Sequence, residues 1–236
     1  MYNLQIPLVR FVGDEYYRFK DEIVSIITYQ VENKVKNGIK GFFLYGKAGT
    51  GKTRLVLEIY KELKPKGFIF YPYDSADIAH KHYGESEKII REIFSKEGER
   101  RIFFFDDVDG LFITREYGVK LETWYLSHLN VLFHEIDKLD TSKDVIFMTT
   151  NKVDLVDFAL IDRLYAIEIP LPSKETMKEY AKERLIELKM INPGGMVSGV
   201  EKIIFDLIDS GKVNNFRDLE KSIIKEYVNW VKKAKK

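Results

Sequence analysis

Short runs of apolar residues recur along the first two thirds of the chain, each bounded by charged or turn-forming residues. The runs are almost continuously apolar rather than alternating, and they are rich in aromatic and β-branched residues. This pattern is typical of strands that are covered on both faces. The sequence therefore predicts five buried strands, at residues 41–45, 68–71, 102–105, 145–148 and 166–169.

The segments between these runs have the period of a helix. In residues 14–36, apolar side chains recur at helical spacing, and the segments at 52–63, 85–94 and 121–136 behave similarly. Strands that alternate with helices predict a parallel sheet packed between helices. The predicted fold class is therefore α/β, with a five-stranded parallel sheet.

The pattern changes after residue 172. Residues 173–190, 200–209 and 215–233 all have helical periodicity, and no further strand is predicted. Ser173 is a residue type that caps helix N-termini well, so it is expected to begin the first of these helices. We therefore predict an α/β core at residues 1–171 and a small all-helical lid at residues 172–236.

Composition and charge exclude several classes of site. The chain has 38 Lys and Arg against 37 Asp and Glu, so no global field draws it to DNA or to an anionic membrane, although a local basic patch is compatible with this balance. It has no Cys, which excludes disulfides, thiolate zinc sites and thiol nucleophiles. No apolar stretch approaches the roughly 18 residues of a membrane span, and no signal peptide is recognised. We expect a cytoplasmic protein without membrane contact.

Eight consecutive residues after the first predicted strand fit the pattern G-x-x-x-x-G-K-S/T at every fixed position. A strand before them and a helix after them form the context of a phosphate-binding loop, or Walker A motif. Glycines let the backbone wrap around phosphates, and the helix N-terminus adds positive potential. Lys52 is expected to neutralise β/γ-phosphate charge, and Thr53 to offer its hydroxyl to Mg²⁺. The predicted loop residues are Gly46, Lys47, Ala48, Gly49, Thr50, Gly51, Lys52 and Thr53.

Two adjacent carboxylates, Asp106 and Asp107, follow the predicted strand at residues 102–105. The C-terminal ends of parallel strands form the ligand-binding edge of such a sheet. Asp106 is predicted to hold Mg²⁺, and Asp107 to position or activate the attacking water. An acidic turn is the alternative for this run taken alone. The phosphate-binding loop before it favours a Walker B site.

With these motifs the chain resembles the AAA+ ATPases, and the AAA subgroup in particular, over almost its whole length. Residues 83–94 are similar to the segment after the second strand in katanin-like and other AAA proteins. Residues 105–109 resemble the family's D-E-x-D with one substitution, and residues 148–151 resemble the sensor 1 strand end. Residues 155–164 resemble the segment that leads to the arginine finger, and residues 169–172 resemble the exit into the helical lid.

The resemblance implies ATP and Mg²⁺ as ligands and assembly into a hexamer-type ring. It gives Asn151 the role of orienting the lytic water with Asp107. It makes Arg163 the arginine finger, which reaches into the neighbouring subunit's site, so that activity requires assembly. From the residues alone, Asn151 is also typical of a turn after a strand, and Arg163 of an exposed helix end.

Two further regions resemble nucleotide contacts of the family. Residues 11–14 resemble the N-terminal turn that touches adenine, which makes Gly13 and Asp14 candidates. Residues 214–220 resemble the sensor 2 motif of initiator and clamp-loader AAA+ proteins, in which a lid arginine contacts the γ-phosphate. AAA proteins proper usually lack this arginine, which here is Arg217. The alternative is an exposed first-turn residue that pairs with Asp218 or Glu220.

The sequence also departs from the family pattern. Asp107 stands where the family has Glu, and a side chain that is one methylene shorter predicts slower hydrolysis. The central-pore loop usually reads aromatic-hydrophobic-Gly, whereas this chain has His82-Tyr83-Gly84 after His80 and Lys81. Such a loop suits either an unfolded protein or nucleic acid, since it offers cations and a stacking face. The alternative is that these residues only cap a helix.

Three functions fit these residues. The first is a ring-forming ATPase that remodels a protein complex, which the resemblance of residues 83–94 favours slightly. The second is a DNA-replication factor, such as a plasmid- or virus-borne helicase loader or an initiator-like ATPase, which the Asp106-Asp107 pair and Arg217 favour. The third is a scaffold that depends on ATP but turns it over little. The client, protein or DNA, is left open by the sequence.

Overall fold

The computed structural model describes residues 9–78, 85–110, 123–191 and 198–234 of the chain. These residues form two compact units. Of the described residues, the first unit holds those in Lys20–Gly46 and Lys52–Ile169, and the second holds residues 9–19, Lys47–Gly51 and those from Pro170 onward. The units are thus not two consecutive stretches of chain, and the predicted domain boundary at residue 171 stays a prediction.

The first unit is built on a five-stranded sheet in which every pair of neighbouring strands is parallel. This confirms the predicted α/β fold with a five-stranded parallel sheet. Its order is β2-β3-β4-β1-β5, so β2 is an edge strand and tolerates Pro72, which has no N–H to donate. The strands are β1 Gly41–Tyr45, β2 Phe68–Tyr73, β3 Arg100–Phe105, β4 Asp144–Thr150 and β5 Tyr165–Glu168.

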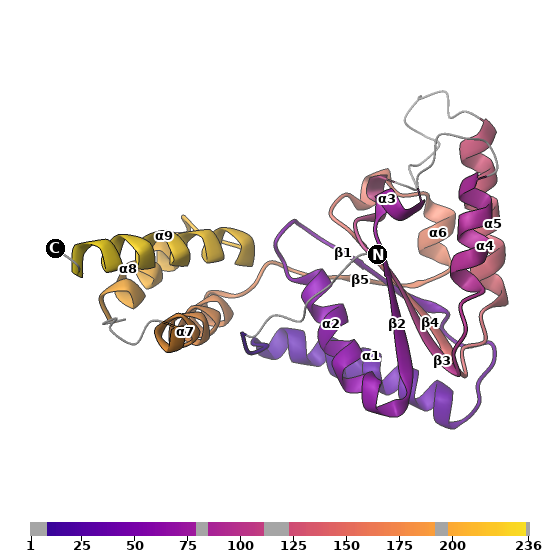
Figure 1. The fold of residues 1–236 in the computed structure, drawn as a ribbon, viewed down its shortest axis with the longest axis horizontal. Coiled ribbons are helices and arrows are strands. Elements are labelled where there is room, and N and C mark those ends of the chain that lie inside the picture. The colour runs from indigo at the N-terminus through magenta and orange to yellow at the C-terminus, as the bar shows by residue number, and fades with distance from the viewer. Residues whose placement is uncertain (1–8, 79–84, 111–122, 192–197, 235–236) are drawn as a thin grey trace. The chain divides into compact units, whose positions relative to one another are not determined.

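Helices alternate with these strands (Figure 1). The first helix was predicted to reach residue 36 but ends at Glu32, because Lys34 adopts a left-handed backbone with φ 54° and the chain turns there. The helices before β5 are α1 Asp14–Glu32, α2 Lys52–Leu63, α3 Ser75–Ile78, α4 Glu85–Phe94, α5 Thr123–Lys138 and α6 Phe158–Asp162. Short 3-10 turns are η1 Lys64–Lys66, η2 Val108–Gly110 and η4 Val153–Leu155.

Apolar residues of the strands face helices on both sides of the sheet, as their unbroken hydrophobicity predicts. On one side, α4, α5 and α6 pack over alternate strand residues such as Phe43, Phe103 and Ile146. On the other side, the ring of Tyr60 in α2 stacks on Phe70, with ring centroids 4.6 Å apart. The helix α1 lies beside α2, where Lys20 Nζ donates to Glu62 at 2.6 Å. The sheet is therefore covered by helices on both faces.

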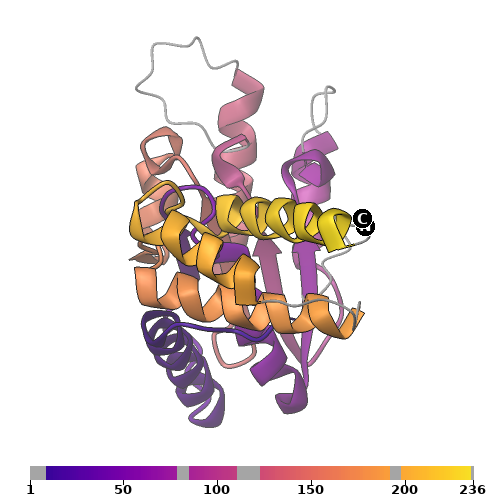
Figure 2. The ribbon, with the colours of Figure 1, turned by 90° about the vertical axis from the view of Figure 1, so that its left-hand side faces the viewer.

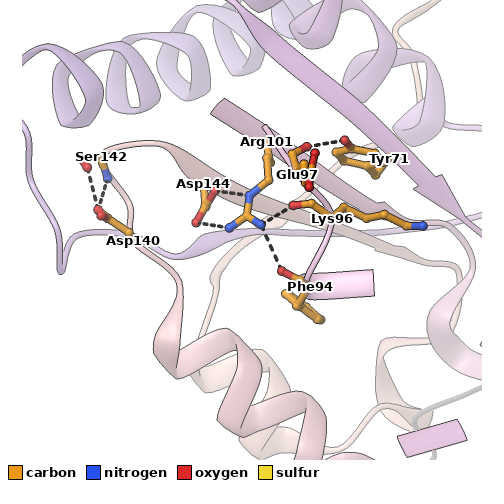
Figure 3. A network of polar contacts seen from close by, with 8 residues as sticks. All are labelled: Tyr71, Phe94, Lys96, Glu97, Arg101, Asp140, Ser142 and Asp144. Carbon is orange, nitrogen blue, oxygen red and sulfur yellow. Dashed lines mark hydrogen bonds and ion pairs between the residues drawn. The ribbon is translucent and has the colours of Figure 1, made fainter. Parts of the chain in front are cut away.

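A buried ion pair ties the amino-terminal ends of β3 and β4 together. The guanidinium of Arg101 donates to both carboxylate oxygens of Asp144 at 2.8 Å, and Figure 3 shows it also reaching the carbonyls of Phe94 and Lys96. This hydrogen bonding raises the pKa of Arg101. The Asp144 side chain is 2% exposed. A buried carboxylate is costly without a partner, so Arg101 offsets the cost of burying this charge.

We expect replacement of one partner of this pair to destabilise the fold strongly. Asp144→Ala leaves the guanidinium without its carboxylate and should lower the free energy of unfolding by about 3–5 kcal/mol, measured by urea denaturation. The control is Lys88→Ala, which removes an exposed pair with Glu92 and should cost less than about 1 kcal/mol. Equal losses for the two variants would contradict a structural role for the buried pair.

The second unit contains three helices that pack on one another, α7 Lys174–Ile191, α8 Ser198–Asp209 and α9 Phe216–Ala234 (Figure 2). Leu185, Ile204 and Ile223 meet in their common core, one residue from each helix. The hydroxyl of Ser173 accepts the N–H of Thr176 at 3.0 Å, which confirms Ser173 as the residue that caps α7. In the described part of the chain, the helices lack the combination of length and apolarity that crossing a bilayer requires.

Candidate active site

Two of the three predicted catalytic residues, Asp107 and Asn151, lie with the predicted metal ligand Asp106 and the phosphate-binding loop at the carboxyl edge of three adjacent strands. Asp106 and Asp107 follow β3, Asn151 follows β4 and Gly46 follows β1, and these strands are neighbours in the order β3-β4-β1. Lys52 begins α2, directly after the phosphate-binding loop. Parallel strands bring their ends to one edge, which explains how residues that are 99 positions apart come into contact.

Lys52 is almost buried, with 6% of its surface exposed. Its Nζ donates to the carbonyl of Gly46 at 2.9 Å and to Oδ1 of Asn151 at 2.7 Å. The ammonium is thus held between the first residue of the loop and the end of β4.

Thr53 and Asp106 lie side by side and offer oxygen ligands. The hydroxyl of Thr53 is 3.0 Å from one carboxylate oxygen of Asp106 and 3.1 Å from the other. Hydroxyl and carboxylate oxygens suit Mg²⁺, which takes one or two protein ligands and completes its shell with phosphates and water. The residues present therefore fit the predicted magnesium site.

Asp107 has a backbone that few non-glycine residues adopt. Its φ is 50°, in the left-handed region that Asp tolerates better than most side chains. One carboxylate oxygen of Asp107 accepts the side-chain N–H of Asn151 at 2.7 Å. The backbone N–H of Asp107 donates to the hydroxyl of Thr149 at 3.1 Å. Asn151 therefore links Lys52 to Asp107, and the two candidate carboxylates are both oriented from β4.

Gly46 shows why the loop needs glycine at its start. Its φ is 142°, and a Cβ built there would lie 2.3 Å from the carbonyl oxygen of Ile169. The N–H of Ile169 in turn donates to the carbonyl of Tyr45 at 2.7 Å. Any side chain at position 46 would push the loop away from the end of β5, so the Walker A glycine has a steric reason here.

Arg163 ends α6 and lies against α5 of its own chain. Its guanidinium sits over the ring of Phe133, 4.3 Å from the centroid, and its Nε is 3.3 Å from Asp137. Its Nη1 donates to the carbonyl of Ala159 at 2.8 Å. The side chain of Arg163 thus contacts residues of its own chain, Phe133 and Asp137, which the sequence did not suggest.

The family model for the ATPase family associated with various cellular activities (AAA) matches residues 42–171. The chain belongs to the AAA family. The match begins in β1 and covers the loop, both carboxylates, Asn151 and Arg163. The predicted resemblance to AAA+ ATPases is therefore confirmed.

Curated AAA relatives match this chain over its core. It is 38% identical over 149 residues to a cell division cycle protein 48 homolog of Archaeoglobus fulgidus, which covers 59% of this chain and 19% of the relative. It is 34% identical to the 26S proteasome regulatory subunit 10B of Dictyostelium discoideum, covering 65% of this chain and 41% of the relative. It is 34% identical to the proteasome-activating nucleotidase of Saccharolobus solfataricus, and this match covers 63% of this chain and 40% of the relative. The chain thus spans less than half the length of these AAA proteins.

In this AAA chain, the tip of the phosphate-binding loop, Lys47–Gly51, belongs to the second unit. The carbonyl of Gly49 accepts the N–H of Phe216 at 2.9 Å. A Cβ on Gly49, where φ is 79°, would lie 2.6 Å from the side chain of Asn215 and 3.1 Å from the Cβ of Arg217. The loop tip therefore touches the first turn of α9, where the predicted sensor 2 arginine stands.

The two alternative partners of Arg217 also accept hydrogen bonds from other residues. The carboxylate of Glu220 accepts from Arg184 at 2.8 Å and from the hydroxyl of Tyr180 at 3.1 Å. The carboxylate of Asp218 accepts from the Asn215 side chain at 2.8 Å, which lowers the pKa of Asp218, and the nearby charges of Lys221 and Arg217 lower it further. Arg217 itself has an exposed side chain. Its proximity to Gly49 keeps it as a candidate for a phosphate contact.

Gly13 and Asp14, the candidate adenine contacts, lie at the start of α1 in the second unit. Gly13 has φ 93°, and its N–H donates to Glu179 in α7 at 3.3 Å. Asp14 is exposed in the first turn of α1. The predicted pore loop, His80 to Tyr83, lies outside the described residues. The role of that loop therefore stays a prediction.

Sequence reasoning assigned no role to several residues that support the site. Phe133 and Asp137 hold Arg163, and Asn215 and Phe216 contact the loop tip. The hydroxyl of Thr149 contacts the carboxylate of Asp106 and the backbone N–H of Asp107. Thr149 lies within the sensor 1 resemblance at residues 148–151, and Asn215 and Phe216 lie within the sensor 2 resemblance at residues 214–220, whereas Phe133 and Asp137 had no signal in the sequence.

Proposed function

We propose that this chain binds ATP with Mg²⁺ at the carboxyl edge of its sheet and hydrolyses it. The observation that supports the proposal is the continuous set of hydrogen bonds from Lys52 through Asn151 to Asp107, beside the Thr53–Asp106 pair. Membership of the AAA family supports the same reaction.

Each residue has a distinct task in this proposal. Lys52 neutralises charge on the β- and γ-phosphates, and the loop amides surround them. Thr53 and Asp106 hold Mg²⁺, which when bound neutralises the charge that develops on the phosphate oxygens. Asp107 accepts a proton from the attacking water, and Asn151 keeps that carboxylate and the water in line. Arg217, which lies beside Gly49, is proposed as a γ-phosphate contact, and Gly13 and Asp14 are proposed as adenine contacts.

We further propose that turnover is slow. Asp107 is one methylene shorter than the usual Glu, so its carboxylate reaches less far toward the water. A misplacement of about 1 Å at a reacting group can cost about 10²-fold in rate. A scaffold that binds ATP and hardly hydrolyses it is the limiting form of this proposal.

We propose a homo-oligomeric ring of the hexamer type that remodels a protein complex. The support is similarity to AAA proteins that are named as proteasome regulatory subunits and as a cell division cycle protein 48 homolog. A comparison of turnover at low salt with and without a partly unfolded protein tests this client class. Stimulation by the protein is expected. Strong, salt-sensitive stimulation by single-stranded DNA instead would favour the alternative, a replication ATPase.

Arg163 is proposed to act as the arginine finger toward a neighbouring subunit. Because it now contacts Phe133 and Asp137, it would exchange those contacts for the neighbour's γ-phosphate on assembly. Arg163→Ala should lower the rate of phosphate release by about 10³–10⁵-fold while each subunit still binds ATP. The control is Asp162→Ala, which changes an adjacent exposed residue and should leave the rate within about twofold.

Mixed assemblies separate a finger that acts in trans from a structural arginine. An Arg163→Ala subunit has an intact hydrolytic site, and an Asp107→Asn subunit has an intact finger. Equal mixing in a head-to-tail ring should restore activity at about one site in four. If the mixtures stay inactive at every ratio while the two variants co-assemble, the trans role of Arg163 is wrong.

A further inference from the structure

Thr149 is a polar residue in the most buried strand of the sheet. It is the sixth residue of β4, Asp144–Thr150, which lies between β3 and β1 and is buried along its whole length. Its side chain has 0% exposure, and it pairs in register with Leu44 of β1. A hydroxyl in such surroundings is unfavourable unless both its donor and its acceptor capacity are used.

Both capacities of this hydroxyl are used by the two adjacent aspartates, through the carboxylate of Asp106 and the backbone of Asp107. Thr149 Oγ1 donates to Oδ1 of Asp106 and accepts the backbone N–H of Asp107 at 3.1 Å. One side chain therefore fixes the rotation of the Asp106 carboxylate and the peptide plane that leads into Asp107. The same Asp106 carboxylate faces Thr53, the other proposed magnesium ligand, at 3.0 Å.

The contact with Asp107 has a specific consequence because of its unusual backbone. At φ 50°, the chain turns sharply after β3, and the N–H of Asp107 points back to β4. The direction of its Cβ depends on that turn. Because the side chain of Asp is short, it has little freedom to reach Asn151 if the backbone of Asp107 is turned differently. The backbone conformation therefore places the carboxylate beside Asn151, at 2.7 Å.

We propose that Thr149 is a positioning residue for ATP hydrolysis, which orients the metal-binding carboxylate and the water-activating carboxylate through one hydroxyl. This proposal rests on the proposed function of the same site. Thr149 itself does not touch the reacting atoms. Replacing a residue that orients a metal ligand typically lowers metal affinity or activity by about 10–100-fold. We expect losses of about this size when the hydroxyl of Thr149 is removed.

The test compares Thr149→Val, which keeps the shape but lacks the hydroxyl, with Thr149→Ser, which keeps the hydroxyl. Thr149→Val should lower kcat about 10–100-fold with the KM for ATP within about threefold. It should also weaken binding of Mn²⁺ in the presence of ADP, measured by electron paramagnetic resonance without any turnover. Thr149→Ser should restore both quantities to within about threefold of the original chain.

A matched control exists at the opposite edge of the sheet. Thr141 is 2% exposed, and its hydroxyl donates to the carbonyl of Val35 and accepts the N–H of Gly38 at 2.8 Å. Thr141→Val thus removes an equivalent buried hydroxyl that is not linked to the carboxylates. It should lower the melting temperature as Thr149→Val does, with unchanged kcat and Mn²⁺ binding.

The outcomes distinguish this proposal from the one on which it rests. If the original chain hydrolyses ATP and Thr149→Val matches it in kcat and Mn²⁺ binding, Thr149 is not a positioning residue. The proposal also fails if Thr141→Val slows turnover equally, since the loss would then reflect general destabilisation. If the original chain releases no phosphate, the proposed function fails, while the Mn²⁺ measurement still tests the role of Thr149. Should Thr149→Val not fold, Thr149→Ala takes its place in each comparison.

Discussion

Lys52→Ala is expected to abolish productive nucleotide binding. The ammonium lies at the start of α2, held by the carbonyl of Gly46 and by Asn151, where the β- and γ-phosphates are proposed to bind. Hydrogen bonds to charged groups contribute about 1.5–3 kcal/mol each, so loss of contacts to two phosphates should weaken ATP binding by about 150-fold or more. Isothermal titration calorimetry with Mg·ATP measures this directly.

The matched control for this variant is Lys61→Ala. Lys61 lies on the same helix, α2, but its side chain is 64% exposed, and among the described residues its Nζ lies 3.8 Å from a carboxylate oxygen of Glu58. This substitution should leave ATP affinity within about twofold, because exposed pairs contribute little. An affinity of Lys52→Ala equal to that of the original chain would contradict the assignment of the phosphate-binding loop.

Asp107→Asn is expected to separate binding from hydrolysis. The carboxamide oxygen can still accept the N–H of Asn151, so the geometry seen at 2.7 Å is retained while the base is lost. General-base catalysis typically contributes 10²–10⁴-fold, so kcat should fall by about that factor. ATP affinity should stay within about twofold, because Asp107 has no proposed contact with the nucleotide in the ground state.

The control here is Asp154→Asn, an exposed carboxylate in the η4 turn shortly after Asn151. It removes the same charge on the same side of the sheet but lies outside the hydrogen-bonded set. Its kcat should be unchanged, and phosphate release under single-turnover conditions compares the two variants. Full turnover by Asp107→Asn would show that another group positions the water.

The fold was predictable from the sequence because its strands are covered on both faces. Runs such as residues 102–105 are apolar without alternation, which indicates a parallel sheet between helices. The phosphate-binding loop at residues 46–53 was equally predictable, because its motif fixes glycine at positions such as Gly46, where a side chain would clash with the backbone of Ile169. The end of the first helix was predicted four residues too late, because a turn at Lys34 leaves no glycine or proline as a signal.

Contacts between segments far apart in sequence were not predictable. Phe133 and Asp137 hold Arg163, but their spacing on α5 is that of any helix face, and nothing in the sequence links them to α6. The contact of Gly49 with Asn215 likewise joins residues more than 160 positions apart in the chain. The periodicity of apolar residues indicates whether a segment is a helix or a strand and which of its faces is buried. It does not indicate which other segment packs against that face.

We propose that this AAA chain hydrolyses ATP at the Lys52–Asp107 site and that assembly completes the site. The most direct measurement is phosphate release per subunit at saturating Mg·ATP over a range of protein concentrations, with sedimentation velocity reporting the assembled fraction in the same samples. We predict slow release whose rate per subunit rises with the assembled fraction and is absent in Lys52→Ala. Fully assembled chain that releases no more phosphate than Lys52→Ala would contradict the account.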